Sequence, residues 1–216
     1  VRETQTDSDN TLIAQEYTYP DATLANGLVL SNMLLNRIRT RTFKGTGQTS
    51  SLAYHYSGNT IWPVSVSRSF GEGPQTTLFT LDRYDERGNL LQSTDPNGIS
   101  TTYLWGYGGT RLVAEIRNAA YQQVANVLGQ ARIDAMTDRI TLSESDIAAL
   151  EGLRSAVALG DTQITTYTHH PIFGVTSRTD PRGVRTSYLY DETGRIKEIA
   201  DDAGNPVVAY DYKYRK

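Results

Sequence analysis

One short motif recurs along the chain and constrains its fold more than any other feature: an aspartate followed three residues later by a glycine. In a type I turn the first-position aspartate bonds to the backbone two residues on, a second-position proline has its φ already set, and a final glycine accepts a positive φ. Neighbouring copies start about ten residues apart, which is the spacing of short hairpins. The motif therefore predicts an array of β-hairpins, with structural turns at Asp85, Gly88, Asp95, Pro96, Gly98, Asp180, Pro181, Gly183, Asp191, Gly194, Asp201 and Gly204.

The composition supports a β-rich chain and excludes several classes of function. Its 216 residues include 14 Tyr but only 4 Phe and 2 Trp, a bias that favours half-buried strands whose rings pack while their hydroxyls reach water. The net charge of −3 provides no basic surface for nucleic acid. Because the chain has no Cys, disulfides and thiolate metal sites are excluded. No apolar run approaches the roughly 18 residues of a membrane-spanning helix, so we expect no membrane-spanning segment.

Hydrophobic periodicity and turn residues divide the chain into strands and two helical regions. Residues 1–10 are polar and are expected to be disordered. A short helix is predicted near residues 22–38, capped by Asp21 or Thr23, and a helical hairpin is predicted from residues 118–138 and 143–159, the second starting in a capping box at Ser143 and Asp146. Strands are predicted at residues 12–19, 37–44, 51–56, 62–70, 76–85, 89–94, 100–105, 111–117, 162–168, 175–179, 184–190, 195–200 and 207–214, with residues 37–44 as an edge or one-sided strand.

These segments define the expected organisation. The strand connections are too short for parallel crossovers, so the pairing must be antiparallel. We expect one structural unit with hairpin repeats over residues 1–117, a helical insertion over 118–160 and further hairpin repeats over 161–216. The best internal match aligns residues 94–105 with residues 179–190 without a gap, which supports a true repeat across the insertion.

The repeated blocks also resemble a known family. The blocks at residues 84–90 and 190–196 both begin Tyr-Asp and contain the turn glycine, and they resemble the YD repeat of the bacterial RHS and teneurin-like families. Residues 103–107, 114–116 and 165–168 strengthen the resemblance, which extends to RHS-repeat proteins of Bacteroidota with a helical insertion. Some RHS proteins carry an enclosed toxin and contain a segment that cleaves this toxin free. The present chain contains no recognisable copy of that segment.

This resemblance implies a mainly β fold, an antiparallel hairpin sheet that is curved or shell-like. In the family such sheets form hollow shells that enclose a toxin or contribute to surface contacts. It implies a secreted or cell-surface location and, as partners, other repeats of a larger chain or an enclosed polypeptide. The expected function is that of a non-enzymatic structural segment of a toxin-carrier type of shell.

No residue pattern predicts a catalytic, cofactor-binding or metal site. Each turn aspartate stands where a turn needs a side-chain acceptor, which explains its position without chemistry. His169 and His170 are adjacent on a predicted strand that ends before Pro171, so their side chains point to opposite faces and do not converge on a metal. His55 has no nucleophile motif beside it. We therefore expect no enzyme activity and no cofactor.

Three aromatic residues are candidates for stacking on a ligand: Trp62, Trp105 and Tyr107. Sugar rings and partner proteins both bind to exposed aromatic faces. The alternative function is thus a cell-surface module that binds a glycan or a protein in adhesion. Packing between neighbouring hairpins is the competing role for these rings and is the one we favour.

Overall fold

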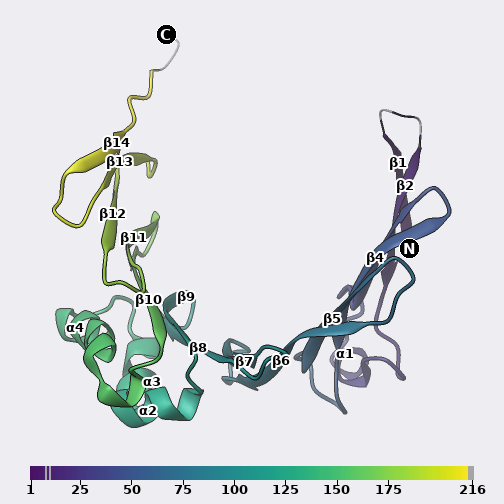
Figure 1. Ribbon diagram of the computed structural model, residues 1–216, viewed down its shortest axis with the longest axis horizontal. Helices are drawn as coiled ribbons and strands as arrows, with labels where there is room; N and C mark the ends of the chain where they lie inside the picture. The colour runs from purple at the N-terminus through teal and green to yellow at the C-terminus, as the bar shows by residue number, and fades with distance from the viewer. Residues whose placement is uncertain (8, 10, 214–216) are drawn as a thin grey trace. The chain divides into compact units, whose positions relative to one another are not determined.

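Fourteen strands follow one another in chain order and form one antiparallel sheet in the computed structural model, which describes residues 1–7, 9 and 11–213 (Figure 1). Each strand from β2 to β13 pairs with the strand before it and the strand after it, so the connections are local hairpins except where helices intervene. The mainly β, antiparallel fold class is confirmed. The strands are β1 Arg2–Thr6, β2 Leu12–Thr18, β3 Arg39–Lys44, β4 Gly47–His55, β5 Ser65–Phe70, β6 Thr76–Tyr84, β7 Leu90–Thr94, β8 Ser100–Gly106, β9 Arg111–Arg117, β10 Gln163–His170, β11 Gly174–Thr179, β12 Arg185–Tyr190, β13 Ile196–Ala200 and β14 Pro206–Ala209.

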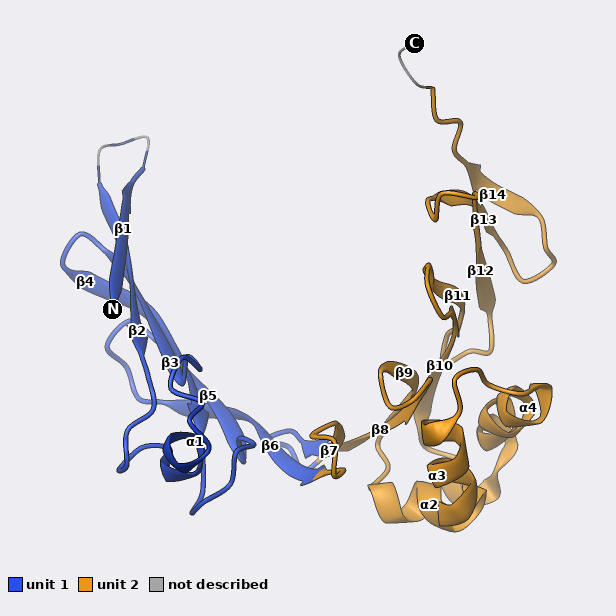
Figure 2. Cartoon of the chain, turned by 180° about the vertical axis from the view of Figure 1, so that it is seen from behind, with its two compact units in different colours: residues 1–83, 93–98 blue, residues 84–92, 99–216 orange. Residues whose placement is uncertain are grey.

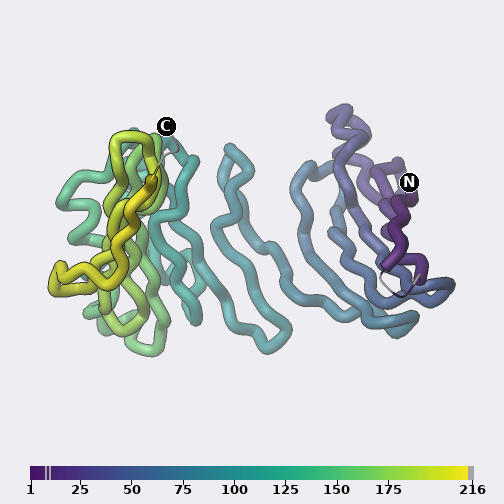
Figure 3. The backbone as a smooth tube through the Cα atoms, turned by 90° about the horizontal axis from the view of Figure 1, so that it is seen from above, coloured from purple at the N-terminus to yellow at the C-terminus, as the bar shows by residue number. Residues whose placement is uncertain are grey.

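The chain divides into two compact units (Figure 2). Unit 1 consists of residues 1–83 and 93–98, and unit 2 consists of residues 84–92 and 99–216. Unit 2 contains the helices between β9 and β10, and the tube in Figure 3 shows its later hairpins following one another toward the carboxyl end. The expected segment boundaries at residues 117 and 160 stay a prediction.

The amino terminus of unit 1 corrects one expectation. Residues 2–6 form β1, which pairs with β2 from Arg2 opposite Glu16 to Thr6 opposite Leu12, and the terminal ammonium of Val1 donates to the Tyr17 carbonyl at 3.1 Å. The prediction of disorder is therefore wrong for this stretch, because ladder hydrogen bonds compensate for its lack of apolar residues. Its outer part, Ser8 and Asn10, lies outside the described residues.

Two further elements of unit 1 differ from the sequence prediction. β3 is not an edge strand, since it pairs with β2 on one side and β4 on the other. The predicted helix over residues 22–38 is only α1, Asn26–Leu30, with Ala25 as its N-cap. The Asp21 carboxylate accepts from the backbone N–H groups of Thr23 and Leu24 in a preceding turn, so Asp21 does not cap the helix.

The helical region of unit 2 is broken into shorter pieces than expected. It comprises α2 Tyr121–Leu128, α3 Gln130–Asp138, α4 Glu144–Gly152 and two single 3-10 turns, η1 Leu153–Ser155 and η2 Val157–Leu159. Gly129, at φ +84°, separates α2 from α3. The capping box of α4 is confirmed: Ser143 Oγ accepts from the Asp146 N–H at 3.2 Å, and Asp146 Oδ2 accepts from the Ser143 N–H at 3.0 Å.

The larger hydrophobic core lies in unit 2, where the helices cover β8, β9 and β10. Apolar side chains from these strands meet those of α2, α3, α4 and the 3-10 turns, and many are fully buried. The central ones are Leu104, Val113, Ile116, Val124, Ile133, Met136, Leu150, Leu153 and Ile164. Unit 1 has a smaller cluster formed by Ala25, Leu28 and Ile38, against which Tyr56 packs.

Candidate functional site

The repeated aspartates all serve as backbone acceptors in the hairpin turns. Asp191 is the fullest case: Oδ1 accepts from the N–H groups of Thr193 at 2.9 Å and Arg195 at 3.0 Å, and Oδ2 accepts from the Arg195 guanidinium at 2.6 and 2.8 Å. The Gly194 N–H closes the turn on the Asp191 carbonyl at 3.0 Å. This is a three-residue hairpin loop in which a type I turn is followed by a left-handed residue.

The other turns share this arrangement. In each, the aspartate Oδ1 accepts from the backbone N–H two residues on, and the glycine N–H donates to the aspartate carbonyl. The glycines all have φ between +80° and +88°, where an L side chain is strained. They are Gly88, Gly98, Gly183, Gly194 and Gly204.

These contacts determine the charge state of three turn carboxyls. The backbone N–H four residues on is the main cause of a lowered pKa for Asp180, Asp191 and Asp201. Guanidinium or amide side chains, from Arg182, Arg195 and Asn205 respectively, lower each pKa further. The carboxylates are thus ionised acceptors whose oxygens are already in use, and they are poorly suited to proton transfer.

Sequence analysis missed a sixth turn of this kind at Asp7. Its Oδ1 accepts from the N–H groups of Asp9 at 3.0 Å and Thr11 at 2.9 Å, and its own N–H donates to the Thr11 carbonyl at 3.0 Å. The available signal was an asparagine three residues after Asp7, since asparagine is the residue after glycine that best tolerates a left-handed backbone. Asn10 itself lies outside the described residues.

A seventh turn, between β10 and β11, uses a histidine where the others use aspartate. His170 Nδ1 accepts from the N–H groups of Ile172 at 3.2 Å and Phe173 at 3.3 Å. His170 lies 85 residues after Asp85, the same offset that aligns residues 94–105 with 179–190. Extending that alignment upstream was the signal that could have identified this turn.

Two aromatic side chains that are also 85 residues apart donate equivalent hydrogen bonds to the backbone. The Trp105 indole N–H donates to the Leu90 carbonyl at 2.8 Å, and the Tyr190 hydroxyl donates to the Val175 carbonyl at 2.7 Å. Both donors lie at or next to the end of a strand, and both acceptors lie just after the preceding glycine-containing turn. The two blocks on either side of the helices are therefore equivalent in their contacts as well as in their sequence.

The three candidate stacking residues are not gathered into one site. Trp105 is half-buried and its indole N–H is bonded within the sheet. Tyr107 is only 9% exposed, belongs to the hydrophobic core, and its hydroxyl accepts from the His169 N–H at 2.8 Å. Burial raises the pKa of this hydroxyl. Tyr107 therefore offers no open face to a ligand, while Trp62 is half-buried in the loop before β5.

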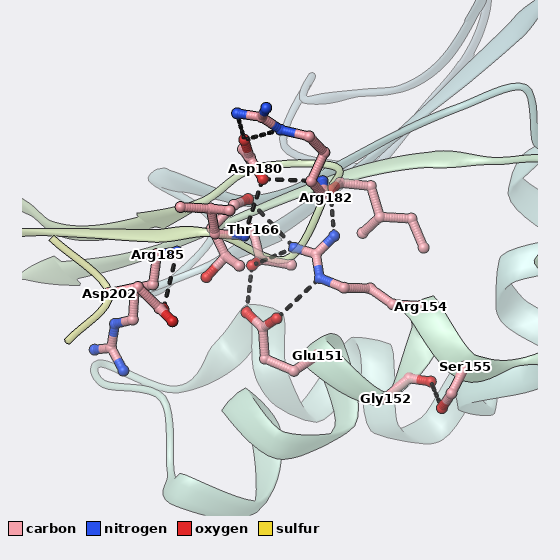
Figure 4. A network of polar contacts seen from close by, with 12 residues as sticks. Glu151, Gly152, Arg154, Ser155, Thr166, Asp180, Arg182, Arg185 and Asp202 are labelled. Carbon is pink, nitrogen blue, oxygen red and sulfur yellow. Dashed lines mark hydrogen bonds and ion pairs between the residues drawn. The ribbon is translucent and has the colours of Figure 1, made fainter.

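A polar network joins α4 to the sheet in unit 2 (Figure 4). Arg154 is its centre: Nε donates to Glu151 Oε2 at 3.0 Å, and the other nitrogens donate to Thr166 Oγ1 and to the carbonyls of Ile164 and Thr179. The Thr166 hydroxyl in turn donates to the Glu151 carboxylate. The network fixes the end of α4 over β10 and β11.

Beside this network lies a small pocket of about 190 Å³. Short hydroxyl side chains at facing positions of β10 and β11, such as Thr168 opposite Ser177, leave space under α4. In the part of the chain that the structure describes, no group of three or more His, Cys, Asp or Glu side chains is placed to hold a metal ion. Among the same residues, no helix has the length and apolarity to span a membrane.

Comparison with known proteins identifies the repeat. Residues 84–122 and 174–206 match the family model of the RHS Repeat. The two matched stretches contain the equivalent blocks described above and cover less than half of the chain. No curated protein matches the chain.

Solved structures provide distant similarities. The match to the Photorhabdus luminescens Tc holotoxin pore with a mutated TccC3 covers 98% of this chain and 11% of the chain in that structure. The sequence identity is 11% and the TM-score is 0.44. The match to the TcdB2–TccC3 structure covers 90% of this chain and 9% of the chain in that structure, with 15% sequence identity and a TM-score of 0.41. The chain thus spans about a tenth of the length of these proteins.

Proposed function

We propose that this chain is a structural segment of an RHS/YD-repeat protein, and that the whole protein is an exported or surface β-shell that encloses or displays another polypeptide. Its role is mechanical, and it performs no catalysis. The observation that carries the proposal is the coincidence of the RHS matches with two blocks whose turns and cross-strand hydrogen bonds are equivalent.

The hydrogen bonding of the sheet supports a role as a wall. Consecutive antiparallel pairing uses the backbone groups of each internal strand on both sides, and the turns satisfy their own backbone through Asp side chains. Among the strands of the described residues, only β1 and β14 have an unpaired side, and the residues of both are exposed. Such edges pair readily with further strands, so they are the surfaces on which adjoining repeats would add.

The partner class follows from this role. Adjoining repeats would contact the sheet edges through main-chain hydrogen bonds, and an enclosed or displayed polypeptide would contact a face of the sheet. A secreted or cell-surface location and an origin among Bacteroidota are part of the proposal and rest on the resemblance of the repeats. The adhesion alternative has no comparable support, because Tyr107 is buried and the Trp105 indole N–H is bonded to backbone.

The experiment is to purify the naturally produced protein, measure its intact mass and identify every polypeptide that remains bound. A mass well above that of the 216-residue chain, or a stoichiometric bound polypeptide, is the expected result. A lone chain of this size with nothing attached would contradict the proposal. Glycan-array binding by such a lone chain would support the adhesion alternative.

A further inference from the structure

The turn between β10 and β11 depends on a neutral histidine. His170 Nδ1 accepts two backbone N–H groups, from Ile172 and Phe173, so this nitrogen must carry a lone pair and no proton. The ring is held in this orientation by Phe173, which stacks on it at a centroid distance of 4.4 Å and an interplanar angle of 12°.

This turn has less backbone support than the aspartate turns. In those turns the fourth residue's N–H donates to the first residue's carbonyl, as Gly194 does to Asp191 at 3.0 Å. Among the described residues, no such bond joins the Phe173 N–H to the His170 carbonyl, and the imidazole takes the place of that acceptor. Loss of the Nδ1 lone pair therefore removes the acceptor of two N–H groups at once.

We propose that His170 makes the β10–β11 turn sensitive to acid: the turn is ordered while the imidazole is neutral and loosens when the imidazole is protonated. Histidine is the side chain that ordinarily changes charge between about pH 5 and 8, and its cation has only donors. The pKa values of the turn carboxyls Asp180, Asp191 and Asp201 are lowered by their backbone hydrogen bonds, so these three remain ionised acceptors in this range. The His170 turn thus responds to mild acid, and the turns of Asp180, Asp191 and Asp201 do not.

The surroundings connect this turn to its neighbour. The ring of Phe173 packs against the ring of Tyr190 on β12, with the two ring centroids 5.8 Å apart. Phe173 also lies against Gly194, since a Cβ added to that glycine would be 2.8 Å from Phe173 Cδ1. Titratable and charged groups near this turn include His169 on β10, which lies near Arg111 of β9, and Tyr190 on β12. Asp191 and Arg195 of the next turn are paired with each other. Loosening at His170 should therefore disturb the packing of Phe173 on the Asp191 turn.

The test is amide hydrogen exchange of the full chain at about pH 8 and about pH 5, expressed as protection factors. Protection of Ile172 and Phe173 should fall about ten-fold or more at the lower pH, since two hydrogen bonds are lost. Protection of Thr193 and Arg195, whose acceptor is Asp191, should fall much less. Equal protection of Ile172 and Phe173 at both values would overturn the proposal.

The matched variant is His170→Asp, which installs the acceptor of the other turns and leaves His55 and His169 in place. It should retain protection at both pH values, and a loss as large as in the unaltered chain would assign the effect to another group and overturn the proposal. His170→Asn supplies an uncharged acceptor that does not titrate, with the same expected result. Independently, imidazole ¹⁵N shifts of the unaltered chain at about pH 8 must show an unprotonated Nδ1 at His170, and a protonated Nδ1 would contradict the geometry.

Discussion

Two glycines in equivalent turns allow the cost of the left-handed backbone to be separated from the cost of packing. Gly183 has φ +83°, and a Cβ added there meets nothing within 4 Å. Gly194 has φ +80°, but a Cβ added there lies 2.8 Å from Phe173 Cδ1. Replacement of each by alanine thus imposes the same backbone strain, and only Gly194→Ala adds a steric overlap.

The expected magnitudes follow from these two contributions. A left-handed L residue costs about 1–2 kcal/mol, which is the whole effect expected for Gly183→Ala. An overpacked contact adds about 1–3 kcal/mol, so Gly194→Ala should cost about 2–5 kcal/mol in the free energy of unfolding. Movement of the Phe173 ring would reduce the second contribution at the expense of its stacking on His170.

The assay is urea unfolding followed by Trp105 fluorescence in a Trp62→Phe background. Trp62 lies in unit 1 and Trp105 in unit 2, and the chain has only these 2 tryptophans, so the signal reports the unit that contains both turns. Equal m-values among the variants are needed for the midpoints to be compared. Equal destabilisation by the two substitutions would refute the packing argument, and no destabilisation by Gly183→Ala would refute the strain argument.

Three other perturbations have definite expected outcomes. Arg154→Met should lower the free energy of urea unfolding by about 2–4 kcal/mol, because the buried carbonyls of Ile164 and Thr179 lose a charged donor; a near-neutral result would contradict the bridging role. Met136→Ala, at a side chain with no exposure, should cost about 2–5 kcal/mol in the same assay, and a cost below about 1 kcal/mol would contradict its place in the core. The third perturbation is a fall in pH, because the pKa of Asp191 is lowered in the folded chain. The ionised Asp191 carboxylate therefore contributes its full stability above the ordinary aspartate pKa, and this contribution is lost as the pH falls below about 4. The unaltered chain should therefore lose more stability than Asp191→Asn between pH values of about 7 and 3, as measured by urea midpoints, and parallel losses would contradict this reasoning.

The hairpins could be predicted from sequence because their signals are local. An aspartate oxygen reaches backbone N–H groups only two and four residues away, and a left-handed residue requires glycine, so each turn is specified within five residues. The strand bounds agree with expectation to within a few residues, as for β9, which is Arg111–Arg117 as predicted. The final strand, predicted to reach Tyr214, ends at Ala209, and Tyr214 lies outside the described residues.

The sequence predictions are wrong where contacts between residues far apart in the sequence determine the local structure. Residues 2–6 are polar, yet they form a strand because β2 offers an unpaired edge. The helix predicted over residues 22–38 shortens to five residues at Asn26–Leu30, where Gly27 packs against the backbone of Thr60, an approach that sequence periodicity does not encode. Tyr107 is buried in the core of unit 2, and its hydroxyl accepts from the N–H of His169, which lies 62 residues away in the sequence.

Two turns were not predicted because the acceptor or the left-handed residue of the turn is not the one in the aspartate–glycine motif. His170 and Asp7 both supply the acceptor of a turn, but neither has the glycine three residues on that the motif contains. A search for the hydrogen-bonding role, together with the 85-residue offset, would have found His170. The Arg154 network was missed because its partners lie on α4, β10 and β11, which only the fold brings together.

The central claim is that this chain forms part of a longer wall of RHS/YD hairpins, and electron cryomicroscopy of the naturally produced particle tests it most directly. The account predicts density for a further strand hydrogen-bonded to the free side of β14 or of β1, in register with the existing ladder. A particle in which both of these edges face solvent, with no polypeptide against either face of the sheet, would contradict the claim.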